Sequence, residues 1–507
     1  MDVPSGDRRV IPRWRQSLTT IATREVDHPE ENLDREDVPV DFLASKIAAW
    51  KRHRTVRFAA DVVTAGLVLG LYESVADAAR YLLEAPDVPG TARRMARIVL
   101  GRESSTPSDE QMELPLDEDP VRSAVRQLRA LLRDEPRNAL MWADLALAYT
   151  SVGQSKKAEH AMRNALSLAP HNRLVLRSAA RLYVHLGDAE RAHEILRRSD
   201  AIVIDPWLMA SEVAVATVAN IRPLYLKRGK ELIERGVHSP FHLAELRAAL
   251  GTLEVLDGVA RKGRRLFKDA LEDPNDNTVA QAEWASRHLN EFRLESKDLK
   301  IPRSFEAKAW EAYWEADWPE ALNQAKQWAQ DEPFSVAPGM LASFLAGTVL
   351  EDYSEGAALA RRSLHANPTD LGLKNNFVFA LAKDGKLVEA TTAYKTIDES
   401  DLRTPRMRVL WLATGGLLEF KSGDVARGRE LYSAAAAYAT EKGDPRLAAL
   451  ASGFLAWEEL IAGTPEAAAL AASVLPKLEL DPAVGRPILI PKILALLKDS
   501  AAKNPTR

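Results

Sequence analysis

Hydrophobic residues recur at helical spacing through most of the chain, most clearly in residues 138–170. Leu145, Tyr149 and Val152 lie three to four positions apart and therefore share one face of a helix. Gly153 follows, and a glycine can end a helix by adopting a positive φ. A second helical face comes next, formed by Ala158, Met162 and Ala165. The pattern predicts a hairpin of two helices, which cannot bury its apolar face until neighbouring hairpins stack on it.

The segment that follows repeats this hairpin. Three pairs of residues are each separated by 34 positions: Tyr149 and Tyr183, Gly153 and Gly187, and Ala158 and Ala192. Together with Trp142, Leu145 and Pro170, the pattern resembles the tetratricopeptide repeat family, whose signature is W-x2-L-G-x2-Y followed by A-x3-F, Ala and Pro. The resemblance implies an all-α fold, an α-solenoid of stacked helical hairpins with a TPR-like superhelix. It also implies a concave, partner-binding face lined by the first helix of each hairpin.

Weaker copies of the pattern extend to about residue 475, and acidic stretches interrupt the N-terminal third. The short apolar run 201–204 is interpreted as packing, not as a strand. Arg222-Pro223 should break the helical periodicity. We expect a flexible basic arm (1–39), an N-terminal helical region (40–101), an acidic linker (102–119), a first repeat array (120–300), a second array (301–480), and a C-terminal capping helix and tail (481–507).

The composition is that of a folded protein, with 46% hydrophobic and 28% charged residues. A net charge of −4 argues against a chain that coats nucleic acid or anionic membrane along its whole length. The chain has no cysteine, which excludes disulfides, thiolate metal sites and a cysteine nucleophile. The most apolar stretch, 58–72, is interrupted by Asp61 and is shorter than the roughly 20 residues of a spanning helix. We expect a cytoplasmic protein, and its alanine and arginine content favours a bacterial source.

Catalytic and cofactor motifs do not occur in the sequence. It has no P-loop, no G-x-G-x-x-G and no G-x-S-x-G. DPNDN at 273–277 departs from a calcium loop, because Thr278 stands where the glycine belongs, and a turn with a helix-capping asparagine fits better. His238 and His242 have the spacing of two metal ligands on a helix, but Pro240 predicts a helix start between them. We therefore expect no enzyme activity, no cofactor and no metal.

Two aromatic and basic segments are candidates for partner binding. Trp310 and Trp314 are four positions apart and form a stripe, which is either hairpin core or an aromatic anchor site. Arg13, Trp14 and Arg15 belong to the basic run 8–17. This run is either a disordered tail or an arm that docks in a partner pocket or contacts phosphate. A second basic run, 51–57, could add to such a patch.

The family resemblance adds four candidates in the groove. In its register Arg177 and Arg181 should face inward, and so should Asn375 and Asn376. Arginine suits carboxylate or phosphate groups, whereas asparagine can pair with an extended peptide backbone. The carboxylate clamp of some family members is not reproduced, since Ala143 and Leu147 occupy the facing positions in the clear repeat.

These observations favour a protein-binding scaffold or accessory subunit whose groove recruits or positions another protein, for instance an effector enzyme encoded nearby. The alternative is a nucleic-acid-binding accessory protein that uses the basic N-terminal segments. The sequence leaves open the oligomeric state and whether the groove holds the protein's own arm.

Overall fold

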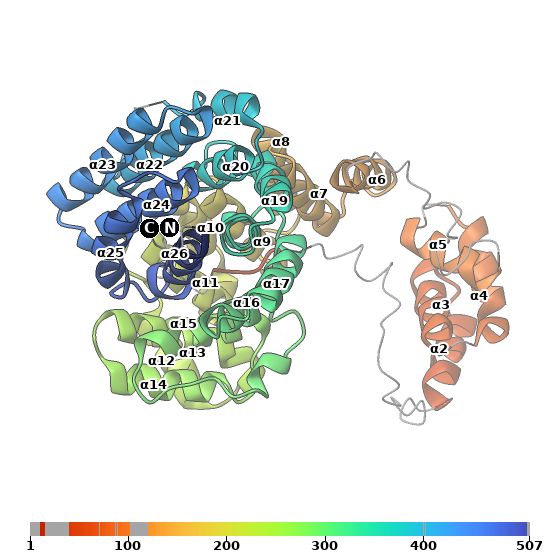
Figure 1. Cartoon of the computed structure of the whole chain (residues 1–507). Helices are drawn as coiled ribbons and strands as arrows, with labels where there is room; N and C mark the ends of the chain where they lie inside the picture. The colour runs from red at the N-terminus through yellow and green to blue at the C-terminus, as the bar shows by residue number, and fades with distance from the viewer. Residues whose placement is uncertain are drawn as a thin grey trace. The chain divides into compact units, whose positions relative to one another are not determined.

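Helices make up all the regular structure in the part of the chain that the computed structural model describes, namely residues 11–15, 40–69, 71–86, 88, 90–101, 120–398, 400 and 402–503. Consecutive helices pack against one another from α2 to α5 (residues 40–99) and from α9 to α26 (residues 173–503), so the predicted all-α, helical-repeat fold is confirmed (Figure 1). The described residues fall into two compact units. Unit 1 lies within residues 1–15, 149–157 and 170–507, and unit 2 within residues 16–148 and 158–169.

Unit 2 begins with a bundle of four helices. Among the helices that the structure describes, those that lie wholly in this unit are α2 (Val40–Arg52), α3 (Val56–Leu69), α4 (Tyr72–Glu84), α5 (Gly90–Val99) and α6 (Pro120–Asp134). Trp50, Val63 and Leu82 belong to the hydrophobic core that α2 to α5 share. The division between the units falls within α7 (Ala139–Ser151) and α8 (Ser155–Leu168). These two helices coincide with the hairpin predicted for residues 138–170.

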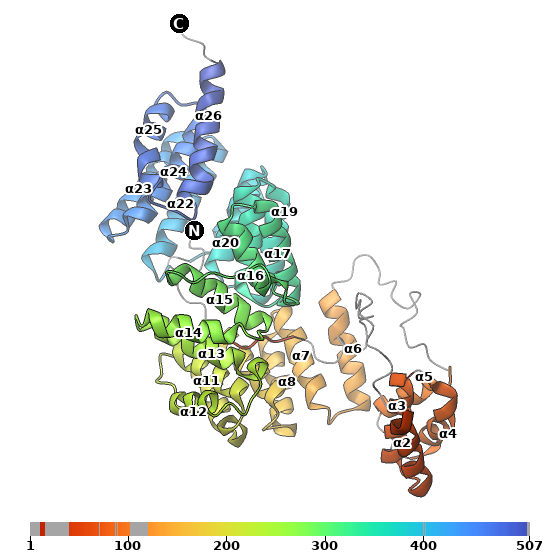
Figure 2. The ribbon, with the colours of Figure 1, turned by 90° about the horizontal axis from the view of Figure 1, so that it is seen from below.

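Unit 1 is a series of helical hairpins that follow one another along the chain (Figure 2). Its helices are α9 (Arg173–His185), α10 (Ala189–Arg197), α11 (Pro206–Val218), α12 (Leu226–Arg235), α13 (Pro240–Leu256), α14 (Ala260–Ala270), α15 (Asp276–His288), α16 (Phe305–Trp314), α17 (Trp318–Asp331), α18 (Val336–Phe344), α19 (Tyr353–Ala366), α20 (Leu371–Lys383), α21 (Leu387–Tyr394), α22 (Pro405–Ser422), α23 (Val425–Glu441), α24 (Pro445–Ala462), α25 (Ala467–Leu478) and α26 (Ile490–Lys503). Besides packing on its neighbour in sequence, the first helix of a hairpin packs on the first helix of the next, as in α9 with α11, α18 with α20, and α22 with α24. This is the stacking of a TPR-like solenoid.

Glycine–aspartate pairs set several of the turns inside the hairpins. Gly187 and Gly423 adopt φ values of 79° and 97°, which end the first helix. The aspartate that follows caps the second helix: Asp188 accepts a hydrogen bond from the Arg191 N–H at 3.1 Å, and Asp424 does the same at the start of α23. Each such cap typically stabilises a helix by about 1 kcal/mol. The hairpin boundaries are therefore encoded locally in the sequence.

The repeat is interrupted in two places. Between α11 and α12 the chain passes through Arg222-Pro223, so the predicted break in periodicity is confirmed. The apolar run 201–204 contributes to a 3₁₀ turn, η3 (Asp200–Val203), so its interpretation as non-strand is confirmed too. The second interruption follows α15, where residues 289–304 hold only a short 3₁₀ turn, η4 (Asp298–Lys300), before α16 begins. Within the described residues, no helix is both long and apolar enough to cross a membrane.

Candidate functional site

A short extended segment, Ile11–Arg15, lies against the helices of unit 1 and is called here the arm segment (Figure 1, red). Pro12 restricts the preceding residue to an extended conformation. Pro12 and Trp14 are buried, and the other three residues are partly buried. The Asn277 side-chain amide of α15 donates a hydrogen bond to the Ile11 carbonyl at 3.2 Å. The segment is thus part of the folded unit.

Trp14 is the apolar anchor of the arm segment. Its side chain is only 1% exposed and meets the ring of Phe334 edge-on, with 5.3 Å between the ring centroids. Phe334 in turn contacts His185 of α9 edge-on and lies beneath the Arg181 guanidinium, which is 4.7 Å from the ring centroid. Within the described part of the chain, the indole N–H of Trp14 has no hydrogen-bond partner. Trp14 therefore binds by shape and apolar contact.

Four carboxylates surround the arginines of the arm segment. We call them the acidic cup: Asp276 at the start of α15, Glu306 in the first turn of α16, and Asp331 and Glu332 at the end of α17. Arg13 pairs with Glu332 at 2.9 Å, with Asp276 at 3.4 Å and, at closer range, with Glu306. Arg15 pairs with Asp276 and Asp331, both at 2.6 Å. The two guanidiniums thus join three helices of unit 1.

The charges of the cup depend on the arm segment. Burial alone would raise the pKa of Glu332, but Arg13 and Arg181 outweigh burial and hold this pKa below its ordinary value. The pKa of Asp276 is lowered in the same way, against burial, by Arg13 and Arg15. For Asp331 burial prevails over the attraction of Arg15, and its pKa is raised.

Two basic side chains of α9, those of Arg181 and His185, border the cup. Burial lowers the pKa of Arg181 in spite of the neighbouring Glu332, and Arg181 donates a hydrogen bond to the Ser335 hydroxyl at 3.2 Å. Burial, helped by Arg181, lowers the pKa of His185 to about 4. His185 is therefore neutral at pH 7, and Arg181 contributes the permanent charge on this side of the cup.

Local structure places the carboxylates. Asn275 caps α15 by accepting a hydrogen bond from the Thr278 N–H at 2.9 Å, which puts Asp276 at the positive end of the helix dipole. Glu332 accepts a hydrogen bond from the Trp328 indole N–H at 3.1 Å. Asp331 and Glu332, by contrast, stand at the carboxyl end of α17, where the helix dipole disfavours negative charge. Cations from elsewhere in the chain are therefore needed to stabilise the negative charge of this pair.

The structure brings four of the sequence-predicted site residues together: Arg13, Trp14, Arg15 and Arg181. Arg177, one turn before Arg181, is buried instead in a neighbouring polar group. It pairs with Glu245 of α13 at 2.8 Å, donates to the Trp207 carbonyl at 3.1 Å and thereby links α9, α11 and α13. Trp310 is 1% exposed and lies in the hydrophobic core, and Trp314 is partly buried against that core.

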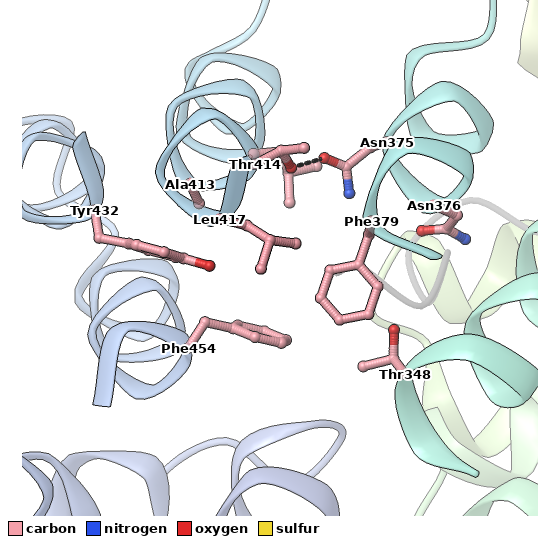
Figure 3. A pocket seen from close by; sticks show the side chains of 10 residues that line it. Thr348, Asn375, Asn376, Phe379, Ala413, Thr414, Leu417, Tyr432 and Phe454 are labelled. Atoms are coloured by element: carbon pink, nitrogen blue, oxygen red, sulfur yellow. Dashed lines mark hydrogen bonds between the residues drawn. The ribbon is translucent and has the colours of Figure 1, made fainter. Parts of the chain in front are cut away.

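Asn375 and Asn376 lie at a separate, uncharged pocket of unit 1 between α20 and α22 (Figure 3). Its volume is about 60 Å³, and it is lined by Thr348, Asn375, Asn376, Phe379, Leu410, Ala413, Thr414, Leu417, Tyr432 and Phe454. The Asn376 amide donates hydrogen bonds to the Met340 carbonyl and the Ser343 hydroxyl, at 3.2 and 3.0 Å. The Thr414 hydroxyl donates to the side-chain amide oxygen (Oδ1) of Asn375.

Two further hydroxyl groups line this neutral pocket. Thr348 is 3% and Tyr432 2% exposed, and the residues that the structure describes offer neither hydroxyl a hydrogen-bond partner. In Figure 3 the Tyr432 hydroxyl points towards Leu417, and the Thr348 hydroxyl points towards Phe379. Burial raises the pKa of Tyr432 well above its ordinary value, so this hydroxyl stays protonated. The pocket can therefore take an uncharged apolar group that also forms hydrogen bonds.

The acidic cup was not foreseen from the sequence. Its residues come from positions 276 to 332, and each carboxylate taken singly is an ordinary residue near a helix end. The informative signal was Asp331-Glu332, an acidic pair at the carboxyl end of a predicted helix. Despite its carboxylates, the described part of the chain holds no group of three or more His, Cys, Asp or Glu side chains suited to a metal ion.

Comparison with known proteins yields structural similarity alone. No family model matches the sequence, and no curated protein matches it. The structure is similar to yeast Tom70, with 14% identity over 76% of this chain and 92% of that one, at a TM-score of 0.29. It is also similar to human IFIT1 in a dimer with m7Gppp-AAAA (14% identity, 72% and 96% covered, TM-score 0.34) and to the Naa15/Naa10 complex with HypK-THB (14%, 92% and 86%, 0.25). These TM-scores carry no argument about function, and the fold assignment above rests on the helices and their contacts.

Proposed function

We propose that this chain is a scaffold or accessory subunit, with no catalysis of its own, that recruits a partner protein by binding an extended segment of it across the helices of unit 1. The observation that carries the proposal is the arm segment, an extended peptide seated on α15, α16 and the end of α17. Extended segments are commonly recognised through a few side-chain anchors. Tryptophan and arginine are the side chains most often found as such anchors.

The neutral pocket at α20 and α22 fits the same function as a second contact. Asn375 and Asn376 belong to α20, which is the first helix of its hairpin. Arg181 lies on α9, which is likewise the first helix of a hairpin. Both N–H groups of Asn376 are used within unit 1, so the Asn375 amide is the one that suits the backbone of a bound peptide, and the apolar wall suits one of its side chains. A partner held at both the cup and the pocket would gain affinity from two linked sites.

A capture experiment tests the proposal. The full-length chain, tagged at its C-terminus, is used to isolate partners from native lysate alongside two variants. D276N/E332Q removes two charges of the acidic cup. E194Q/E430Q is the matched control, since it removes two carboxylates whose side chains are 46% and 66% exposed. We expect a stoichiometric partner that the wild type and the control retain and the cup variant loses. Failure of every variant to retain a stoichiometric protein contradicts the proposal.

Nucleic-acid binding is the second candidate, and one observation favours it. Lys51, Arg52, His53, Arg54 and Arg57 are exposed at the junction of α2 and α3. Arg13 and Arg15, in contrast, are engaged with the acidic cup, so the run 51–57 would have to carry the phosphate contacts. A mobility shift with RNA or DNA at low salt, abolished by R52E/R57E, would support this function. If the nucleic-acid probe does not shift even at low salt, nucleic-acid binding is excluded as a function.

A further inference from the structure

We propose that the arm segment is an internal ligand, which fills the acidic cup in the free protein and is displaced by a partner segment of the same chemistry, an extended arginine–aromatic–arginine sequence. The proposal rests on the proposed function and specifies the class of partner and how its access is controlled.

The alternation of side chains along the arm defines what the cup accepts. In an extended chain, residues two apart point to the same side and the residue between them to the opposite side. Arg13 and Arg15 accordingly share the carboxylate of Asp276, while Trp14 is turned to Phe334. A segment with two guanidiniums spaced i and i+2 and an aromatic ring between them satisfies both sides of the site.

The cup is unfavourable when empty. Its Glu332 side chain is 2% exposed, and the side chains of Asp276, Glu306 and Asp331 are at most 13% exposed. These exposures are those of the cup with the arm docked; withdrawal of the arm admits water but leaves like charges close together with fewer cationic partners, which is unfavourable. The site therefore favours a basic occupant at all times, and exchange of one basic segment for another is easier than vacancy.

The arm segment is an imperfect occupant. Only one side-chain hydrogen bond, from Asn277, reaches its backbone among the bonds that the structure describes. Among the described residues, the buried indole N–H of Trp14 has no hydrogen-bond partner, and the Nε of Arg13 lies 3.4 Å from the Asp276 carboxylate without forming a hydrogen bond. A partner segment whose donors are all satisfied would bind the same cup more tightly. Covalent attachment compensates for the imperfect fit, because it gives the arm a high effective concentration.

The test uses a labelled peptide that copies residues 8–17 (RRVIPRWRQS), titrated into full-length protein and followed by fluorescence anisotropy. The variant R13E/R15E repels its own arm from the cup and leaves the cup carboxylates unchanged. The control R198E/R427E makes the same change in net charge at arginines whose side chains are 74% and 50% exposed. A peptide with Ala in place of the tryptophan serves as the ligand control.

The expected difference follows from competition. In the wild type, the apparent Kd is close to the sum of the intrinsic Kd and the effective concentration of the tethered arm. In R13E/R15E the apparent Kd falls to the intrinsic value. We expect R13E/R15E to bind at least about tenfold more tightly than both the wild type and the control, and D276N/E332Q added to R13E/R15E to abolish the gain.

Three outcomes overturn the proposal. The first is equal binding of the peptide by R13E/R15E and the control. The second is tightened binding that persists when the cup carboxylates are neutralised. The third is a concentration-dependent dimer of the wild type that R13E/R15E dissolves, which would assign the arm to the cup of a second copy. W14A, with both arginines retained, repeats the comparison should R13E/R15E unfold.

The same data separate this proposal from the proposed function. A partner captured from lysate independently of the cup, together with no peptide binding to R13E/R15E, refutes the internal-ligand proposal and leaves the scaffold function standing. Peptide binding to the emptied cup without any captured partner refutes the scaffold function alone.

Discussion

Replacing Trp14 by alanine tests most directly whether side-chain burial holds the arm segment in place. The substitution removes the indole from its contact with Phe334 and leaves both arginines of the arm free to pair with the cup. It is chosen because the indole lies at the centre of the docked segment and is 1% exposed.

The magnitude follows from the buried area. A buried tryptophan removes about 150–250 Å² from water, which at about 25 cal/mol per Å² stabilises docking by roughly 4–6 kcal/mol. Ordering the backbone of five residues opposes docking by roughly 5–10 kcal/mol. The ion pairs must supply the remainder, so the net stability of the docked arm is small. Truncation of a buried tryptophan typically costs about 3–5 kcal/mol, a factor of more than about 100 in the docking equilibrium.

Limited digestion with trypsin measures this equilibrium in the full-length protein. Trypsin needs an accessible arginine, and the docked arm holds Arg13 and Arg15 in ion pairs. We expect W14A to raise the cleavage rates after these two residues to those of a fully undocked arm, since cleavage tracks the open population when docking is fast. W142A, which removes a partly buried tryptophan outside the arm and the cup, is the control. Cleavage rates within twofold of the wild type would refute the reasoning.

Three further substitutions test the charges and the packing of unit 1. The pKa of His185 is lowered from 6.5 to about 4, so between these pH values the unfolded chain binds a proton that the folded chain does not. The free energy of unfolding should therefore rise with pH over this range. In urea unfolding at pH 4.5, 5.5 and 7, H185Q should reduce this rise by at most about 3 kcal/mol. Glu458 pairs with the buried Lys383 at 2.6 Å, so E458Q should lower the free energy of unfolding by about 3–5 kcal/mol, against less than about 0.5 for the exposed E430Q; equal effects would contradict this. At Gly416 an added Cβ would lie 2.7 Å from the Tyr432 ring, so G416A should cost about 1–3 kcal/mol, and an unchanged urea midpoint would show that α22 and α23 separate freely.

The helices and hairpins could be predicted because their signals are local. Tyr149 and Tyr183, with the glycine that follows each, define the repeat by spacing alone, and Gly187-Asp188 ends one helix and caps the next within two residues. Such signals depend on neighbours three or four positions away, which a sequence displays directly. The break at Arg222-Pro223 was visible for the same reason.

The candidate site could be predicted only in part, because its chemistry is tertiary. Arg13, Trp14 and Arg15 stood out as an unusual basic and aromatic run. Nothing in their sequence neighbourhood identifies Glu306 or Glu332, about 300 positions away, as their partners. These partners come together because of the interruption after α15, where the chain continues to α16 without a second α-helix. A repeat pattern does not reveal which face such an interruption leaves open.

The use of charges at this site argues for exchange over permanent anchoring. Apolar residues of similar volume usually stabilise a protein as well as a buried ion pair does, because ions must first lose their hydration. A chain that only needed to fix its N-terminal segment would gain more from leucines against Phe334 than from arginines against four carboxylates. Carboxylates instead demand a cationic occupant and reject most others, which is how an interface gains specificity.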